Sequence, residues 1–277
     1  MTRSLGRGEL DGEQGRWLDL PLLIISPHYD DAMLSVFSLI GPTRLGVPDV
    51  HVLTVFGGRP VPAVRERWDA LCGFSDSDVA MAARAEEERR AFAGLSVQLT
   101  SLALLEGQYR EAHPPMEART EYLSFVLEWA AAATGGVLVA PAGAGGTRTF
   151  QQRVRSRVPS KRFGLAGGST PNTDHLWVTD VLVDAVAPTT DLVLYNDQPY
   201  SWVKDGSSRA ETVAAIMGRR SVAITHRIDV TEKVRRSSAY ASQIPHLLRS
   251  WAHLGSAMPK QEMFWHLPAT TPSLSKD

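Results

Sequence analysis

Residues 21–35 read PLLIISPHYDDAMLS, and this stretch predicts both a fold class and a site. The continuous apolar run over residues 22–26 is typical of a strand buried on both faces of a parallel sheet. His28, Asp30 and Asp31 follow directly after it. Adjacent carboxylates repel each other and form strands poorly, so a bound cation would explain why the two occur together. The stretch therefore predicts a buried strand that ends in a metal site.

The rest of the chain alternates apolar runs with helical patterns. Further strands are expected at residues 50–56, 101–105, 136–141 and 192–197. Helices are expected at residues 32–46, 79–95, 117–133, 175–186 and 230–248. This alternation predicts an α/β fold with an open, largely parallel sheet flanked by helices in three layers. Ligands of such sheets bind at the carboxyl ends of the strands, which is where His28, Asp30 and Asp31 lie.

The composition restricts the class of protein more than its activity. With 277 residues, 43% of them hydrophobic, the chain can form a sizeable core and is not expected to be disordered. The net charge of −1 gives no indication of a nucleic-acid or membrane partner. The single cysteine, Cys72, rules out an internal disulfide and a thiolate zinc cluster. The sequence shows neither a signal-peptide core nor an apolar run of the about 20 residues that span a membrane, so a cytoplasmic location is expected.

The loop after the first strand offers one imidazole and two carboxylates, a ligand set that suits Zn²⁺ or Fe²⁺. Catalytic zinc usually takes three protein ligands, so a distant residue must complete the set. The best candidate is His175, because it begins a helix after the strand that ends at Pro141. Weaker candidates are the other histidines: His51, His113, His226, His246, His253 and His266. The alternative interpretation is an Asx-type turn whose aspartates cap the next helix.

The order of the motifs resembles that of the PIG-L/LmbE-type metal-dependent N-deacetylases. That family has a Rossmann-like fold, with P-H-x-D-D near the first strand and a later H-x-D-H. Residues 20–268 carry the resemblance through these segments in the family's order: SPHYDDAMLS, HVLTVFGG, RAEEERRAFAGL, LEGQYR, TDHLWVTDVL, LYNDQPYSW, YASQ and EMFWHL. The resemblance therefore covers nearly the whole chain.

This resemblance implies a role for each matching residue. It makes His28, Asp31 and His175 the ligands of a zinc ion, with Fe²⁺ as the alternative metal. It makes Asp30 the general base, which leaves one carboxylate for the cation and its neighbour free to take a proton. It also implies that Asp174 orients a histidine.

The second motif departs from the family at its first position, where Asn172 replaces the histidine. In relatives that histidine is thought to assist as an acid or an oxyanion donor. Asparagine cannot titrate, but its NH₂ group can still donate a hydrogen bond. Three consequences stay open: Asp30 takes over the acid role, the enzyme is slow, or the substrate differs.

Three further charged residues match family positions that contact substrate, namely Arg84, Glu106 and Arg110. Their alternative interpretation is solvated charges on a helix face and at strand ends. Aromatic side chains are also available to stack on a sugar ring, although core packing is the default for each of them. They are Trp68, Tyr109, Tyr200 and Trp202.

The predicted organisation is a flexible tail at residues 1–18, a single deacetylase-like domain at 19–268 and a C-terminal tail at 269–277. Relative to the family, residues 142–171 form an insertion with six basic residues and no acidic one. Arg153 and Arg155 lie in its middle and are predicted to contact an anionic group of the substrate. The alternative is a solvated surface loop.

The sequence thus predicts a zinc-dependent hydrolase that removes an N-acyl group, expected to be acetyl, from an amino sugar or a related small metabolite. The sugar and the setting in specialised metabolism rest on the resemblance. The alternatives are a non-catalytic metabolite- or carbohydrate-binding relative and a metal-dependent ester or phosphoester hydrolase. The expected partner is a small N-acylated molecule, with or without an anionic group. The sequence makes no prediction of oligomeric state.

Overall fold

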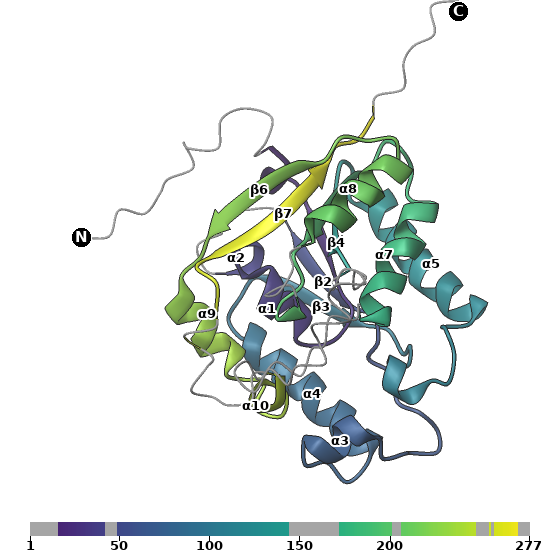
Figure 1. The fold of residues 1–277 in the computed structure, drawn as a ribbon, viewed down its shortest axis with the longest axis vertical. Helices are drawn as coiled ribbons and strands as arrows, with labels where there is room; N and C mark the ends of the chain where they lie inside the picture. The colour runs from purple at the N-terminus through teal and green to yellow at the C-terminus, as the bar shows by residue number, and fades with distance from the viewer. Residues whose placement is uncertain are drawn as a thin grey trace, which may run out of the picture.

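The computed structural model describes residues 16–41, 49–143, 172–200, 206–247, 255 and 258–270. Within these residues, seven strands form one sheet in the order β3-β2-β1-β4-β5-β7-β6 (Figure 1). Five neighbouring strands run parallel: β3 (Val97–Ser101), β2 (Val50–Thr54), β1 (Leu22–Ser26), β4 (Val137–Pro141) and β5 (Asp191–Tyr195). Antiparallel strands β7 (Gln261–Leu267) and β6 (Val222–Arg227) complete the sheet. The predicted α/β fold with a largely parallel sheet is confirmed.

Helices cover both faces of the sheet, because alternate residues of each strand point to opposite sides. One face packs against α1 (Asp31–Ser35), α2 (Phe37–Ile40), α4 (Ser77–Phe92) and the segment that includes α9 (Val230–Ser237) and α10 (Ile244–Leu247). The other face packs against α5 (Met116–Ala132), α7 (Thr173–Ala185) and α8 (Ser207–Ile216), as Figure 1 shows. Ile24 lies in the first of these cores and Ile25 in the second. The predicted three-layer arrangement is therefore confirmed.

The remaining described elements are short. They are α3 (Arg67–Leu71) and two 3₁₀ turns, η2 (Arg16–Asp19) and η4 (Gly107–Tyr109). No helix in the described part of the chain is long and apolar enough to cross a membrane. The predicted domain boundaries stay predictions. The insertion at 142–171, apart from its first two residues, and most of both predicted tails lie outside the described residues.

The predicted continuous helix at 32–46 is wrong. The chain forms α1, leaves helical geometry at Val36 and restarts as α2. Glu262 of β7 accepts hydrogen bonds from the backbone N–H groups of Phe37 at 2.9 Å and Ser38 at 2.7 Å, at the start of α2. Lys233 donates to the same carboxylate at 2.6 Å, and both charged side chains are fully buried. A partner more than 200 positions away thus stabilises the break, and residues 42–46 lie outside the described part.

Two other predicted elements are shifted. The third parallel strand is Val97–Ser101 rather than 101–105, because Ser101 is the last residue opposite β2, and only the isolated bridge from Phe56 to Ala103 follows. The predicted helix 230–248 ends at Ser237 and resumes at Ile244, because Glu87 accepts the backbone N–H of Ser242 in the intervening turn. Strands β6 and β7 and helices α3 and α8 had not been predicted.

Candidate metal centre

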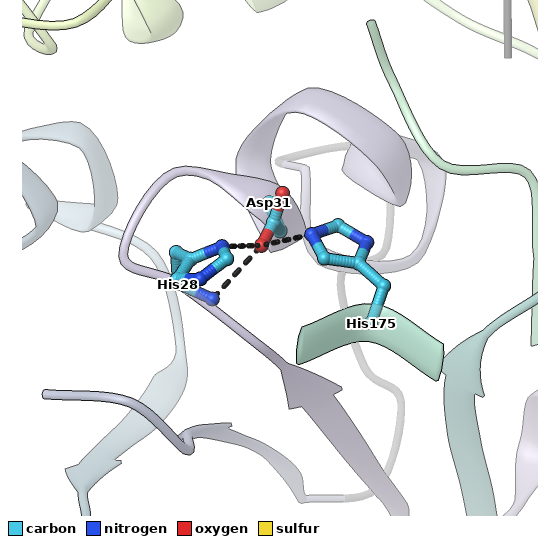
Figure 2. A group of neighbouring side chains, drawn as sticks. All are labelled: His28, Asp31 and His175. Atoms are coloured by element: carbon cyan, nitrogen blue, oxygen red, sulfur yellow. Dashed lines mark hydrogen bonds and ion pairs between the residues drawn. The ribbon is translucent and has the colours of Figure 1, made fainter. Parts of the chain in front are cut away.

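Two neighbouring parallel strands bring the predicted ligands together. His28 and Asp31 lie on the turn and the first helical residue after β1, and His175 lies in the first turn of α7, after β4. Because β1 and β4 are adjacent and parallel, their carboxyl ends meet at one sheet edge. Figure 2 shows the three side chains converging there. The predicted proximity of His28 and His175 is confirmed.

The geometry of these three residues fits a cation. One ligand atom from each lies within 4.8 Å of the others. Asp31 Oδ2 is 3.1 Å from both His28 Nδ1 and His175 Nε2. All three side chains are buried, and the contact of His175 Nε2 with Asp31 is an ion pair that lacks hydrogen-bond geometry. Two imidazoles and a carboxylate form a ligand set that zinc and Fe²⁺ both accept.

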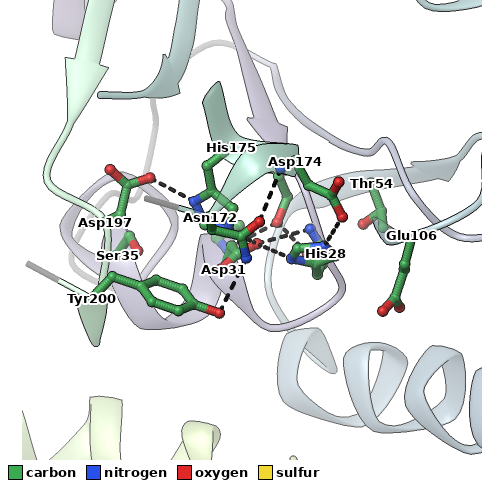
Figure 3. Close-up of polar contacts among 12 residues, drawn as sticks. His28, Asp31, Ser35, Thr54, Glu106, Asn172, Asp174, His175, Asp197 and Tyr200 are labelled. Carbon is green, nitrogen blue, oxygen red and sulfur yellow. Dashed lines mark hydrogen bonds and ion pairs between the residues drawn. The ribbon is translucent and has the colours of Figure 1, made fainter. Parts of the chain in front are cut away.

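The outer nitrogen of each imidazole contacts a second carboxylate. His28 Nε2 lies 3.0 Å from Asp174 Oδ2, and His175 Nδ1 lies 2.8 Å from Asp197 Oδ1 (Figure 3). Such carboxylates fix the tautomer and direction of metal-binding imidazoles. Asp174 therefore contacts His28 rather than its sequence neighbour His175. Asp197 was missed from the sequence, although its place two residues beyond β5 on the same sheet edge was a usable signal.

The carboxylates of the centre favour positive charge on both imidazoles. Burial lowers the pKa of His175, but Asp31 and Asp197 outweigh this and raise it to about 9. Burial also lowers the pKa of His28, and its bonds with Asp174 and Asp31 raise it well above its ordinary value. Burial raises the pKa of Asp31, but the two imidazoles bring it far below its ordinary value. The three aspartates around the two imidazoles thus favour positive charge at the place where a divalent cation would bind.

Zinc binding near pH 7 is expected to release about two protons per chain, because both imidazoles must be neutral to bind and both pKa values are raised. The affinity should therefore rise with pH to at least about pH 9, the pKa of His175, because the pKa of His28 is raised as well. Calorimetric zinc titrations in two buffers of different ionisation enthalpy measure the number released. His51→Gln, which changes a histidine elsewhere on β2, should leave that number unchanged. Equal heats in both buffers would contradict the prediction.

Asp30 occupies the N-cap position of α1 but makes no capping hydrogen bond. Ser26 Oγ accepts the N–H of Ala32 at 3.0 Å instead, so the predicted alternative, in which both aspartates cap the helix, is wrong for Asp30. Burial and the charge of Asp31 raise the pKa of Asp30 to about 6, against the opposing effects of Arg84 and His28. A carboxylate of this pKa is ionised at pH 7 and can accept a proton.

Comparison with solved structures identifies proteins of the same fold. The sequence matches no protein-family model and no curated protein. The zinc-inhibited form of teicoplanin deacetylase Orf2 superposes with a TM-score of 0.66 at 19% identity, over 91% of this chain and 100% of that one. N,N'-diacetylchitobiose deacetylase from Pyrococcus horikoshii gives a TM-score of 0.50 at 13% identity, over 95% and 91%. The chain has the fold of these deacetylases.

This deacetylase fold also occurs with another reaction. GalB, the 4-carboxy-2-hydroxymuconate hydratase from Pseudomonas putida KT2440, superposes with a TM-score of 0.52 at 13% identity, over 92% of this chain and 100% of that one. The fold by itself therefore does not decide the activity, which has to be argued from the side chains at the sheet edge.

The described charged residues that were predicted to contact substrate form ion pairs with other side chains of the protein. Arg84 forms a buried ion pair with Glu106, so the solvated alternative is wrong for both. Arg110 pairs with Asp174, donates to the carbonyl of Leu105 and lies 5.0 Å from the centre of the Phe56 ring. Arg110 thus positions the carboxylate of Asp174, which in turn contacts His28. Arg153 and Arg155 lie outside the described residues, as does Trp202.

Glu88 of α4 is, like Asp30, a buried acidic side chain with a raised pKa. Glu88 accepts a hydrogen bond from Thr54 Oγ1 at 2.6 Å, and only 5% of its surface is exposed. Burial raises the pKa of Glu88 to about 8, against the effect of that hydrogen bond. The native state therefore binds this proton more tightly than the unfolded chain does. The free energy of unfolding should fall as the pH rises from about 4.5 to about 8.

Glu88→Gln is expected to remove this loss of stability, because the amide keeps the acceptor for Thr54 and carries no charge. The variant should exceed the wild type at pH 9 by on the order of 3 kcal/mol and differ little from it at pH 5. Urea unfolding at both pH values measures the difference. An equal gap between the two proteins at pH 5 and pH 9 would contradict the raised pKa.

Proposed function

We propose that the protein is a metal-dependent N-deacetylase of the PIG-L/LmbE type, acting on an N-acetylated amino sugar or a related small metabolite. The observation that carries the proposal is the buried group of His28, Asp31 and His175 with the carboxylate of Asp30 beside it and not used for capping. The fold, shared with deacetylases of teicoplanin and of N,N'-diacetylchitobiose, supports it.

The ligand set suits zinc, with Fe²⁺ as the alternative. When bound, the cation would polarise the amide carbonyl and make a nearby water more acidic. Because one similar deacetylase is described in a zinc-inhibited form, the metal of this chain needs to be tested among several divalent ions. Asp174 and Asp197 would hold the two imidazoles in the tautomers that binding requires.

Asp30 carries the proton transfers of the proposed hydrolysis. The carboxylate of Asp30 accepts a proton from the attacking water. The water oxygen bonds to the carbonyl carbon, and the π electron pair of the C=O bond moves onto the carbonyl oxygen. The C–N bond then breaks as this pair returns, and Asp30 delivers the proton to the departing nitrogen. Water is thereby added across the amide, and the products are a carboxylic acid and a free amine, with the proton of the acid passing to the amine or to solvent at pH 7.

The substrate class rests on two lines of support. Deacetylation of N,N'-diacetylchitobiose and of teicoplanin by proteins of this fold favours an acylated sugar, and the latter favours specialised metabolism. The basic residues of the 142–171 insertion favour a substrate with an anionic group. We further propose a small-molecule partner and a cytoplasmic location.

Amine release from a panel of N-acetylated sugars, with O-acetyl and phosphoester analogues as comparisons, tests the proposal. The protein is assayed after loading with Zn²⁺, Fe²⁺, Mn²⁺ or Co²⁺ and after chelation. Release of amine that requires metal is the expected result. Tight metal binding without turnover would instead indicate the binding protein, and turnover of esters alone would indicate the ester hydrolase.

A further inference from the structure

Asn172 has both ends of its side-chain amide engaged. It is the N-cap of α7, and its Oδ1 accepts the backbone N–H of Asp174 at 3.0 Å. This bond sets the direction of the amide, because the oxygen faces the helix and the NH₂ faces away. Nδ2 then donates to the hydroxyl oxygen of Tyr200 at 3.4 Å. One of the two N–H donors of Asn172 is thus used within the protein.

Tyr200 lies against the metal centre. Its ring meets the imidazole of His175 edge-on, with the ring centroids 5.2 Å apart and the planes at 76°. Figure 3 shows the ring beside His175 and its hydroxyl directed toward Asn172. The backbone just before Tyr200 is tied to the same region, because Gln198 N–H donates to Ser35 Oγ of α1 at 3.0 Å. The position of the phenol is therefore set from two sides.

The contact with Asn172 leaves the phenol as a donor. A tyrosine hydroxyl can accept and donate at once, and here its oxygen already accepts. The described part of the chain provides no acceptor for the O–H of Tyr200. A preorganised donor near a reacting carbonyl is worth most when it faces the oxygen on which negative charge develops.

We propose that Tyr200, oriented by Asn172, donates the hydrogen bond that stabilises the oxyanion of the substrate, in place of the histidine that the family motif carries at position 172. This inference rests on the proposed hydrolysis of an amide. Tyr200 is the catalytic residue of the pair, and Asn172 is a positioning residue that acts through it.

Tyr200→Phe is expected to lower kcat about 100- to 1,000-fold, the usual effect of removing one oxyanion donor, with KM changed less than about threefold. The metal content should match that of the wild type. Tyr122→Phe removes a phenol that bonds the carbonyl of Val178, outside the proposed centre, and should leave kcat unchanged. Asn172→Ser keeps a capping oxygen for α7 but loses the NH₂ donor, and should lower kcat about tenfold.

The double variant separates positioning from direct contact. Because Asn172 acts through Tyr200, adding Asn172→Ser to Tyr200→Phe should cause no further loss. A further tenfold loss would mean that Asn172 contacts the substrate itself and would overturn the assignment. Loss of metal in Tyr200→Phe, or a kcat within twofold of the wild type, would overturn it as well.

A binding measurement distinguishes failure of this inference from failure of the proposed function. Methylphosphonate is a small tetrahedral oxyanion, and its affinity for the metal-loaded protein can be measured without turnover. Tyr200→Phe should weaken it about tenfold, as expected for the loss of one hydrogen bond to a charged oxygen. Equal affinity in both proteins would overturn the role of Tyr200. If the wild type releases no amine but binds methylphosphonate about tenfold more tightly than Tyr200→Phe, the deacetylase proposal is overturned and the role of Tyr200 as a donor to an oxyanion is kept.

Discussion

Asp30→Asn is expected to lower kcat about 100- to 10,000-fold while leaving the metal content unchanged. Asparagine has the shape of aspartate but cannot accept a proton from water or return one to the amine. The ligands His28, Asp31 and His175 are untouched, so the cation should still bind. Steady-state amine release with a saturating N-acetylated substrate, together with metal analysis of the same sample, measures the effect.

The neighbouring carboxylate provides the matched control. Asp31→Asn makes the same chemical change one residue further on, where the oxygen lies 3.1 Å from both imidazoles. This variant should lose metal and activity together, whereas Asp30→Asn should lose activity alone. An Asp30→Asn protein that keeps more than about a tenth of the wild-type kcat would show that another group accepts the proton.

His175→Ala is expected to abolish metal retention and turnover. The change removes the ligand from α7, and two ligands on one loop rarely hold a catalytic cation. It also leaves Asp197 fully buried without its imidazole partner, which should lower the free energy of unfolding by about 3 kcal/mol. Metal analysis after dialysis and urea unfolding of the metal-free proteins measure the two effects.

A second change keeps this test interpretable if the alanine variant folds poorly. Adding Asp197→Asn removes the uncompensated charge and should recover part of the stability without restoring metal binding. His51→Gln alters a histidine that bonds Thr100 between β2 and β3, and it should retain the metal. Stoichiometric zinc in the folded His175→Ala protein would place the cation elsewhere.

Most of the parallel sheet could be predicted from the sequence, because central strands are short apolar runs and the helices between them repeat every three or four residues. The two outermost strands of the sheet, β6 and β3, were harder to predict. In β6, only Ile224 is fully buried, so the strand lacks the continuous apolar run of β1. The strand at 101–105 was misplaced for a related reason, since the half-exposed residues of β3 look less like a strand than the apolar ones after it.

The candidate site divides in the same way. His28 and Asp31 are three residues apart on one turn, so their proximity follows from local geometry. His175 could be predicted because it begins the helix after a central strand. The place of Asp197 just beyond β5 was a usable signal, but its role and that of Tyr200 depend on which strand neighbours β4 and on the conformation of the chain beyond β5.

The sequence by itself determined the buried strand and the ligand types, because these follow from patterns within short segments. It also indicated the edge at which the ligands gather, because the carboxyl ends of parallel strands meet at one edge of the sheet. The tertiary structure alone decided that Asp174 serves His28, that Glu262 interrupts the first helix, and that Asn172 is turned toward Tyr200. These contacts join segments up to 225 positions apart, and no local pattern encodes which distant partner a buried polar group will meet.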